Sequence, residues 1–495
     1  MTDLLPHLPA LQVVIPLIAA PLCVAAGRGR LAWLVALLAS LSSFVIAAKL
    51  THMVYVNDPI VYPLGGWLAP FGITYVVDAV NSFILLIVSG VALLVVVFGL
   101  LSVEREIAAD RQHLFWCTYT LCLTGLLGIT ITGDAFNVFV FLEISSLSSY
   151  ALIAMGRNRK ALTASFQYLV MGTIGATFYL IGVGLLYMVT GTLNMADLQV
   201  RLPEVWHLRP VLAAFGFMVV GIALKLALFP LHLWLPNAYA HAPSAVSAFL
   251  AATATKVSVY VLLRIMFTIF SASFAYVILP MHWVLLVPAL LAMFAGSFSA
   301  IFQTNMKRML AYSSVAQIGY IVLGLSIPVI DGIAAGMLHI FNHALMKGAL
   351  FCALGCVFYR IGSVRIDDMA GLAREMPWTM ATIVIGGLSL IGVPLTAGFV
   401  SKWFLLQAAL EVGYWWLALL IVASSMLAVI YVWRLVEAMY FRQPPPGRAA
   451  VKEAPLSMLL PMLTLAGANI YFGIHTTLPV ELSLRAATAL LRGFW

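Results

Sequence analysis

The chain has 495 residues, of which 63% are hydrophobic and only 9% are charged. No soluble domain of this length keeps so little charge, so the composition excludes soluble protein classes and predicts an all-α polytopic membrane protein. The formal net charge of +8 is then expected to come from loops that orient the chain in the membrane, and not from a surface that binds nucleic acid.

Fourteen apolar segments are predicted to span the bilayer, because each is about as long as the 20 residues that a spanning helix needs. They begin near residues 10, 31, 75, 113, 134, 162, 211, 243, 277, 309, 332, 377, 414 and 455. The first is not expected to be a cleaved signal peptide, since Asp3 and no lysine or arginine precedes it.

The short loops predict the orientation of the chain. Most loop lysines and arginines follow odd-numbered segments, whereas the other side, tails included, carries only Lys49, Arg201, Arg209, Arg485 and Arg492. Lysine and arginine favour the cytoplasmic side of a membrane. Both termini are therefore expected on the outer face of a bacterial cytoplasmic (inner) membrane.

Two acids stand out in the first five segments. Asp78 opens the third segment, where it serves either as a helix-start acid on the favourable end of the helix dipole or as a supporting group in ion transfer. Glu143 lies about halfway along the fifth segment. Neighbouring serines are one way to satisfy its carboxylate, but an acid at this depth is costly and is therefore a functional candidate.

The stretch from residue 221 to residue 256, GIALKLALFPLHLWLPNAYAHAPSAVSAFLAATATK, joins two apolar segments that carry Lys225 and Lys256. Pro230 and Pro236 follow Lys225 and are expected to break its helix. A lysine near the bilayer centre costs roughly 2.5–3.5 kcal/mol on insertion scales. A broken helix beside a buried charge therefore indicates function. Arg264, further along, is expected to reach outward to the interface.

The eleventh segment places His339, His343 and Lys347 at successive steps of four, and therefore on one stripe of a helix. A metal site, a haem and a hydrated polar stripe are the alternatives. The stripe is favoured, because no carboxylate or cysteine is placed to complete a metal site. The five cysteines form no CxxC motif, so we expect no metal and no cofactor.

The twelfth segment, GGLSLIGVPLTAGFVSKW, is interrupted by Gly392, Pro394 and Gly398 shortly before Lys402. This second broken helix beside a lysine mirrors the first. Arg434 and Glu437, three apart near the end of the next segment, are expected to form an interfacial ion pair.

The mirrored breaks predict two inverted five-helix repeats, an arrangement known in transporters. The expected organisation is residues 1–112 for three flanking helices, 113–271 for the first repeat, 272–442 for the second, and 443–495 for the last helix and the tail.

Several motifs together resemble the proton-translocating antiporter family, which includes Mrp-type antiporters and the antiporter-like subunits of respiratory complex I and membrane-bound hydrogenases. They are GDAFNVFVFLEISSLSSYAL, ALKLALFPLHLWLPNAYAHAPSAVSAFLAATATK, MLAYSSVAQIGY, HIFNHALMKGALF and GVPLTAGFVSKW. The resemblance covers nearly the whole chain. It implies that the glutamate of the fifth segment pairs with the lysine of the seventh, and that a hydrated proton path continues from there. The residues that it places on this path are Glu143, Lys225, Lys256, His339, His343, Lys347 and Lys402, with Asp78, Pro230 and Pro394 in support.

Within that family the chain looks most like the D subunit of an Mrp-type Na+/H+ antiporter, on its glutamate stretch and on the loop GGWLAPFGITYVVDA. The alternative is a proton-pumping, non-catalytic subunit of a complex I-type NADH:quinone oxidoreductase or a hydrogenase; inorganic-carbon-uptake relatives also remain open. Either way we expect a transporter subunit and no enzyme. The subunit is expected to work together with other membrane subunits. Na+ is expected to pass elsewhere in the complex, because the core offers essentially one central carboxylate. An independent solute transporter and a non-conducting structural subunit are the competing classes.

Overall fold

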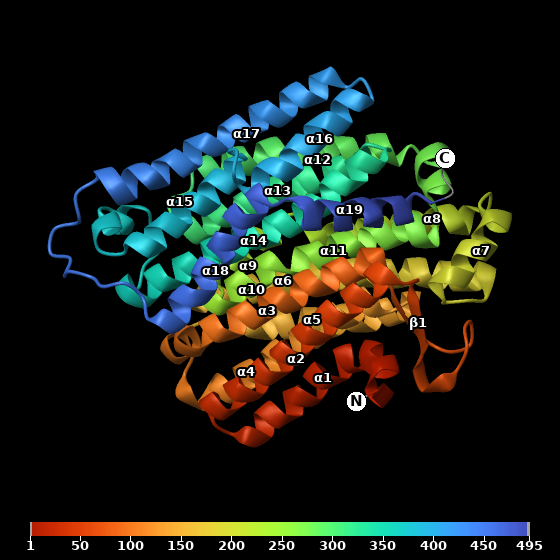
Figure 1. The fold of residues 1–495 in the computed structure, drawn as a ribbon, viewed down its shortest axis with the longest axis horizontal. Coiled ribbons are helices and arrows are strands. Elements are labelled where there is room, and N and C mark those ends of the chain that lie inside the picture. Colours follow the sequence, from red (N-terminus) through yellow and green to blue (C-terminus); the bar gives the residue numbers. More distant parts are fainter. Residues whose placement is uncertain (1, 493–495) are drawn as a thin grey trace.

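The computed structural model describes residues 2–492 and shows a bundle of long helices that run side by side (Figure 1). Within these residues, 13 helices are long and apolar enough to cross a membrane. The remaining predicted segment, the twelfth, is split into two shorter helices. The all-α, polytopic class and the fourteen predicted segments are thus confirmed for the described part of the chain.

The helices of the first half have these bounds: α1 Leu8–Ala26, α2 Gly29–Val56, α3 Ala79–Glu106, α4 Gln112–Ile131, α5 Ala135–Ala154, α6 Arg159–Thr190, α7 Met195–Val205, α8 Arg209–Leu226, α9 Trp234–His241, α10 Ser244–Ala252 and α11 Ala254–Leu263. Those of the second half are α12 Met281–Ile301, α13 Met306–Ser326, α14 Ile330–Ile361, α15 Pro377–Ile391, α16 Ala397–Glu411, α17 Trp415–Val436, α18 Leu456–Ile474 and α19 Thr477–Leu490. The strands are β1 Ile60–Pro63 and β2 Thr74–Val77.

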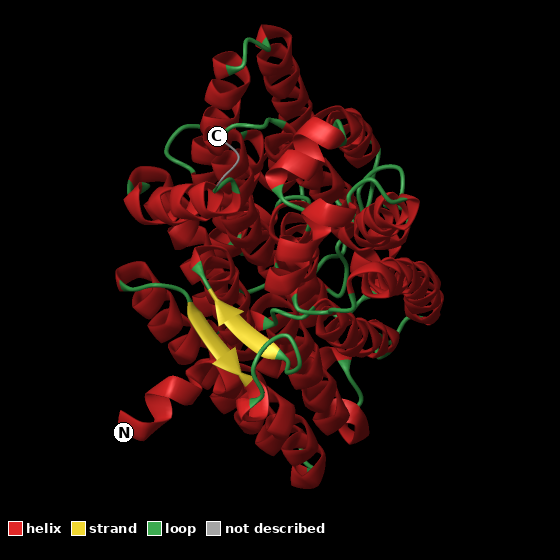
Figure 2. Cartoon of the chain, turned by 90° about the vertical axis from the view of Figure 1, so that its right-hand side faces the viewer, coloured by secondary structure: helices red, strands yellow, loops and turns green. Residues whose placement is uncertain are grey.

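Both termini and the β-hairpin lie at one end of the bundle, which we call the terminal end (Figures 1 and 2). Shared placement of the termini agrees with an even number of crossings. The antiparallel hairpin and the C-terminal helix α19 were not predicted. Both escape a search for spanning helices, since the strands have four residues each and α19 has 14.

The two predicted helix breaks are present. Helix α8 ends at Leu226, Ala227 adopts a left-handed conformation with φ 57°, and α9 begins only at Trp234, beyond Pro230. The carbonyl of Leu224, in the last turn of α8, accepts from the amide of Ala227 at 3.2 Å and also from the indole of Trp234 at 2.9 Å, so the side chain that opens α9 helps to hold the end of α8. The second break lies between α15 and α16, and it contains Gly392 at φ 90° and Pro394.

A further interruption lies in the eighth segment, where Thr253 leaves helical geometry between α10 and α11. The same segment then changes to a π-helix, η4 Arg264–Ile269. Neither feature is marked by proline or glycine, the residues that predicted the other breaks. This interruption places an irregular backbone directly before Lys256.

Helix α14 lies at the centre of the second half, where it packs against α3, α10, α13, α15, α16, α18 and α19. Nearly all of its residues from Gly332 to Val357 are buried. The predicted histidine and lysine stripe therefore lies inside protein and not against lipid. The inverted repeat and its boundaries stay predictions.

Candidate proton-transfer site

Lys225, at the end of α8, is 5% exposed, and its ammonium donates to Ser146 Oγ of α5 at 2.6 Å. Glu143 lies three residues before Ser146, but no ion pair within 4 Å joins it to Lys225 among the described residues. Its Oε1 is buried and has no hydrogen-bond partner there. The serine thus stands where the family resemblance led us to expect the carboxylate, and the pairing of Glu143 with Lys225 stays a prediction.

The face of α5 that carries Glu143 is otherwise apolar and exposed. Phe136, Val140 and Leu147 share this face at helical spacing and are 43%, 38% and 54% exposed. A half-buried carboxylate within such a face is unsuited to lipid, because intramembrane acids pair with protein groups or face water.

A small cavity of about 20 Å³ separates Lys225 from the eighth segment. Ser145, Ser146 and Ser149 line it on one side, and Val257 and Ser258 of α11 on the other. A space of this size holds about one water molecule, and the hydroxyl groups supply the polar partners that such a water needs. The cavity therefore leads from Lys225 toward the helix that carries Lys256.

Lys256 is 1% exposed, and its ammonium donates to the carbonyl of Ala251, next to the interruption at Thr253. On α14, Lys347 donates to the carbonyl of Leu310 at 2.8 Å and to the hydroxyl of Ser313. His343, one turn before Lys347, is fully buried, and neither ring nitrogen has a protein partner among the described residues. Its imidazole is thus free to accept or donate a proton.

His339 is held from both sides. Its Nδ1 lies 2.8 Å from Ser401 Oγ, and its Nε2 lies 2.9 Å from Gln317 Oε1. Asn342 also donates to Ser401 Oγ, at 3.1 Å. The rings of His339 and His343 are nearly parallel, with centroids 6.2 Å apart. These contacts connect the stripe on α14 to α16.

Lys402, the next residue on α16, uses the second helix break directly. Its ammonium donates to the carbonyls of Leu390 and Ile391 at 2.8 and 3.1 Å and to Ser425 Oγ at 3.0 Å. It also lies 4.3 Å from the ring centroid of Tyr320, within the range of a cation–π interaction. The carbonyls that α15 leaves free at its end thus become ligands for the lysine.

Sequence reasoning missed the neutral partners of the charged groups: Ser146, Gln317, Tyr320, Ser401 and Ser425. The signal was present, since each is a polar residue in a segment predicted to span the membrane, and Gln317 and Tyr320 lie in the motif MLAYSSVAQIGY. These side chains do not titrate near neutral pH, so a criterion based on charge passes over them. Among residues 2–492, no three histidine, cysteine or acidic side chains gather as a metal site would require.

Two expectations about arginines were wrong. Arg434 does not pair with Glu437: it donates to the carbonyl of Ile301, whose end-of-helix position leaves it without an intrahelical donor. Glu437 pairs instead with Arg442, at 3.2 Å. Arg264 does not reach outward, because Asp78 binds it inside the protein at 2.7 Å. Asp78 also caps α3, the first of the two alternatives for this residue, since its carboxylate accepts from the amides of Val80 and Asn81; its supporting role stays a prediction.

Known proteins match the chain in sequence and in fold. Residues 132–428 match the family described as "NADH:quinone oxidoreductase/Mrp antiporter, TM". NADH-quinone oxidoreductase subunit N of Desulforudis audaxviator is 42% identical over 94% of this chain and 96% of its own length. The Na(+)/H(+) antiporter D subunit of Alkalihalophilus pseudofirmus is 32% identical over 90% of this chain and 89% of its own.

Among solved structures, a chain of the Mrp complex from Dietzia sp. DQ12-45-1b has a TM-score of 0.90 at 27% identity, covering 99% of this chain and 98% of that one. Sequence identity thus places the oxidoreductase relative ahead of the antiporter relative, which reverses the preference drawn from motifs. The family model covers more than half of the sequence, and the chain belongs to the NADH:quinone oxidoreductase/Mrp antiporter family of membrane subunits.

Proposed function

We propose that the chain is a proton-translocating, non-catalytic subunit of a multi-subunit membrane complex of the NADH:quinone oxidoreductase type. One observation carries this proposal. Lys225, Lys256, Lys347 and Lys402 are all buried, and within residues 2–492 their ammonium groups contact hydroxyls and carbonyls but no carboxylate. A lysine held only by neutral groups is able to lose its proton, whereas one locked to an acid keeps it.

The proposed mechanism passes protons along this row. Glu143 changes the electrostatic potential at Lys225 through the intervening Ser146, so that movement of the carboxylate loads or unloads the lysine. The proton then moves by way of the serine-lined cavity to Lys256 and the α14 stripe. His343 and His339 lead it on to Lys402. A membrane potential supplies about 2.3 kcal/mol per charge per 100 mV for such movement.

The choice of complex rests on similarity to relatives. The 42% identity to an oxidoreductase subunit favours an assembly of the NADH:quinone oxidoreductase type over an Mrp antiporter, for which the best support is the TM-score of 0.90. An Mrp-type Na+/H+ antiporter is therefore the second candidate. In that case Na+ crosses elsewhere in the complex, because Glu143 is the one acid among the residues of the proposed path.

Partner subunits are proposed on physical grounds as well. The exposed apolar face of α5 includes a half-buried glutamate, which a neighbouring protein subunit would shield from lipid. The proposed setting is the bacterial cytoplasmic (inner) membrane, with both termini on the outer face.

The test of transport is Lys225→Ala, measured as proton movement in sealed inverted vesicles that contain the complete complex. We expect proton movement to be lost while the other subunits still co-purify. Arg434→Ala is the control: this side chain contacts a helix end away from the lysine row, so transport should persist. Wild-type proton movement by Lys225→Ala would refute the proposal.

The test of partners is purification in mild detergent followed by mass spectrometry of the co-purifying chains. Redox subunits would support the first candidate, and other antiporter subunits the second. A monomer that transports by itself in liposomes would show that the protein is an independent transporter.

A further inference from the structure

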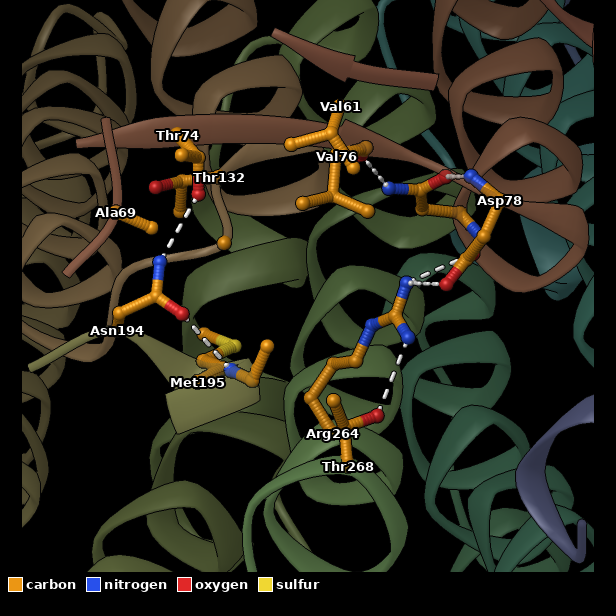
Figure 3. Close-up of a pocket in the computed structure, with 13 residues that line it drawn as sticks. Val61, Ala69, Thr74, Val76, Asp78, Thr132, Asn194, Met195, Arg264 and Thr268 are labelled. Atoms are coloured by element: carbon orange, nitrogen blue, oxygen red, sulfur yellow. Dashed lines mark hydrogen bonds and ion pairs between the residues drawn. The ribbon is translucent and has the colours of Figure 1, made fainter. Parts of the chain in front are cut away.

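Asp78 and Arg264 form a buried ion pair that the proposed path does not use. Arg264 Nη2 lies 2.8 and 2.7 Å from the two carboxylate oxygens of Asp78. The arginine and aspartate side chains are 9% and 19% exposed, respectively, although they are 186 residues apart in sequence. Figure 3 shows the guanidinium and the carboxylate meeting at one side of a pocket.

The arginine continues a polar stripe that starts at Lys256. Tyr260, Arg264 and Thr268 follow Lys256 at steps of four along α11 and η4, so the four residues share one face. Arg264 Nε donates to Tyr260 Oη at 2.8 Å, and Arg264 Nη1 donates to Thr268 Oγ1 at 3.2 Å. The stripe therefore runs from the buried Lys256 toward the terminal end.

The pocket at the end of this stripe has a volume of about 200 Å³, enough for several water molecules. Besides the ion pair, Thr132, Asn194 and Thr268 line it with polar groups. Two other acids lie close by in the chain, but both are engaged. Asp134 caps α5 at the amide of Asn137, and Asp197 pairs with Arg201 at 3.0 Å.

The backbone around the arginine is irregular. The α-helical pattern of α11 ends at Leu263, and the π-helix η4 begins at Arg264 itself. Single π-helical turns occur frequently at functional sites. Asp78, in contrast, is fixed by the capping box that it forms with Asn81 at the start of α3. The pair thus joins a carboxylate held by a helix cap to an arginine at the first residue of a π-helical turn.

We propose that Asp78 is a proton-binding group of an outer branch that leaves the main path at Lys256, and that Arg264 gates this branch. The inference rests on the proposed function and adds a second outlet to it. A proton leaves the Lys256 ammonium, moves past Tyr260 through water, and neutralises the Asp78 carboxylate, while the lysine becomes a neutral amine. Pocket water then takes the proton from Asp78.

The arginine gives the branch its direction. While Asp78 is ionised, the pair is neutral overall and accepts a proton. Once Asp78 is protonated, the charge of Arg264 is uncompensated; it repels the new proton toward the pocket and opposes its return to Lys256. An arginine acts as an electrostatic barrier to protons and cations in other membrane pores. The competing explanation is a structural ion pair that fastens α11 to α3.

The test uses Asp78→Asn with Arg264→Gln. Asparagine is as good a helix cap as aspartate, so the double change removes both charges and keeps the start of α3. A matched control, Asp197→Asn with Arg201→Gln, removes another ion pair near the terminal end. Both are measured in the complete complex, for assembly and for vesicle proton transport, with and without Lys402→Ala, which blocks the main path beyond the branch point.

We expect the Lys402→Ala variant to keep residual proton transport. Adding the Asp78/Arg264 double change should reduce this residual transport by about tenfold or more, which corresponds to a barrier change of ~1.4 kcal/mol. The control double change should leave the residual transport unchanged. If residual transport persists in the double variant, or if Lys402→Ala alone abolishes transport, the branch carries no protons. If the Asp78 variant fails to assemble, Tyr260→Phe replaces it in the experiment. Unchanged residual transport by the Tyr260→Phe variant then overturns the proposal. Wild-type transport by Lys225→Ala would instead refute the proposed function itself.

Discussion

At the residue scale, the charged groups of the core differ in what their partners allow. Arg264 is locked to a carboxylate, while Lys225 donates to a serine hydroxyl and Lys402 to a serine hydroxyl and backbone carbonyls. Neutral partners stabilise an ammonium without fixing its proton, because the same oxygens also accept hydrogen bonds from water. The pattern of partners, more than the presence of lysine, is what separates a proposed proton carrier from a group, such as Arg264, that keeps its charge.

The clearest prediction at this scale concerns Glu143 and Lys225. Glu143→Gln keeps the side-chain shape but removes the charge that acts on Lys225, so proton transport should be lost. Lys225→Ala should be equally inactive, and the double variant no worse than either single one, because residues that act in one step are not additive. The measurement is a pH-gradient assay in inverted vesicles, with blots to confirm equal expression.

Transport at the wild-type rate by Glu143→Gln would show that this carboxylate is merely satisfied by its surroundings. Glu143→Asp is the graded control: it keeps the charge but shortens its reach, so its rate should fall between those of wild type and Glu143→Gln.

At the element scale, the two helix breaks at proline and glycine could be predicted, whereas the interruption at Thr253 and the pairing of Asp78 with Arg264 could not. Pro230 and Gly392 predict the two breaks. Proline lacks the amide proton that a helix needs, and glycine adopts a left-handed conformation easily. The interruption at Thr253 has no such residue, so nothing in the local sequence marks it. The pairing of Asp78 with Arg264 was equally hidden, since the sequence does not tell which distant segments become neighbours.

Gly392 provides a prediction about the second break. It has φ 90°, and a Cβ there would lie 2.9 Å from Lys402 Cδ. Gly392→Ala should therefore strain the backbone by about 1–3 kcal/mol and displace the lysine. We expect a lower melting temperature of the purified complex together with slower proton transport.

Gly216→Ala is the matched control for this change, because Gly216 lies within α8 and a Cβ there meets no atom within 4 Å. It should be neutral or slightly stabilising, since alanine is the better helix former. Equal behaviour of the two variants would contradict the assigned role of Gly392.

A pH dependence is expected where side chains of α19 reach Tyr55, near the end of α2. Tyr55 Oη donates to Glu481 at 2.6 Å, and this hydrogen bond, followed by attraction to Arg485, lowers the pKa of the Glu481 carboxyl. A lowered folded-state pKa means that the contact stabilises above the unfolded-state pKa and is lost as the pH falls through the folded-state value. The melting temperature of wild type should thus exceed that of Glu481→Gln at neutral pH and approach it in acid. A constant difference would exclude this role.

At the scale of the whole molecule, the polar row crosses the bundle from α5, at one surface, to the helix break at Lys402. Its first acid, Glu143, lies on the apolar face with Phe136, Val140 and Leu147. The row therefore begins at an exposed surface of the subunit. Because a carboxylate on this apolar face is costly in lipid, we expect another protein chain to cover the face.

Photo-cross-linking from position 147 tests this arrangement. Leu147 is 54% exposed on the face that carries Glu143, so a photoreactive amino acid placed there should attach to a second protein subunit in the intact membrane complex. The same variant, separated from its partners by harsh detergent, is the control and should give no protein adduct. Because a carboxylate against lipid is costly, a partner is expected on this face whichever complex the chain belongs to. Adducts with lipid alone in the intact complex would contradict that expectation, and Glu143 would then have to be satisfied by a rearrangement within this chain.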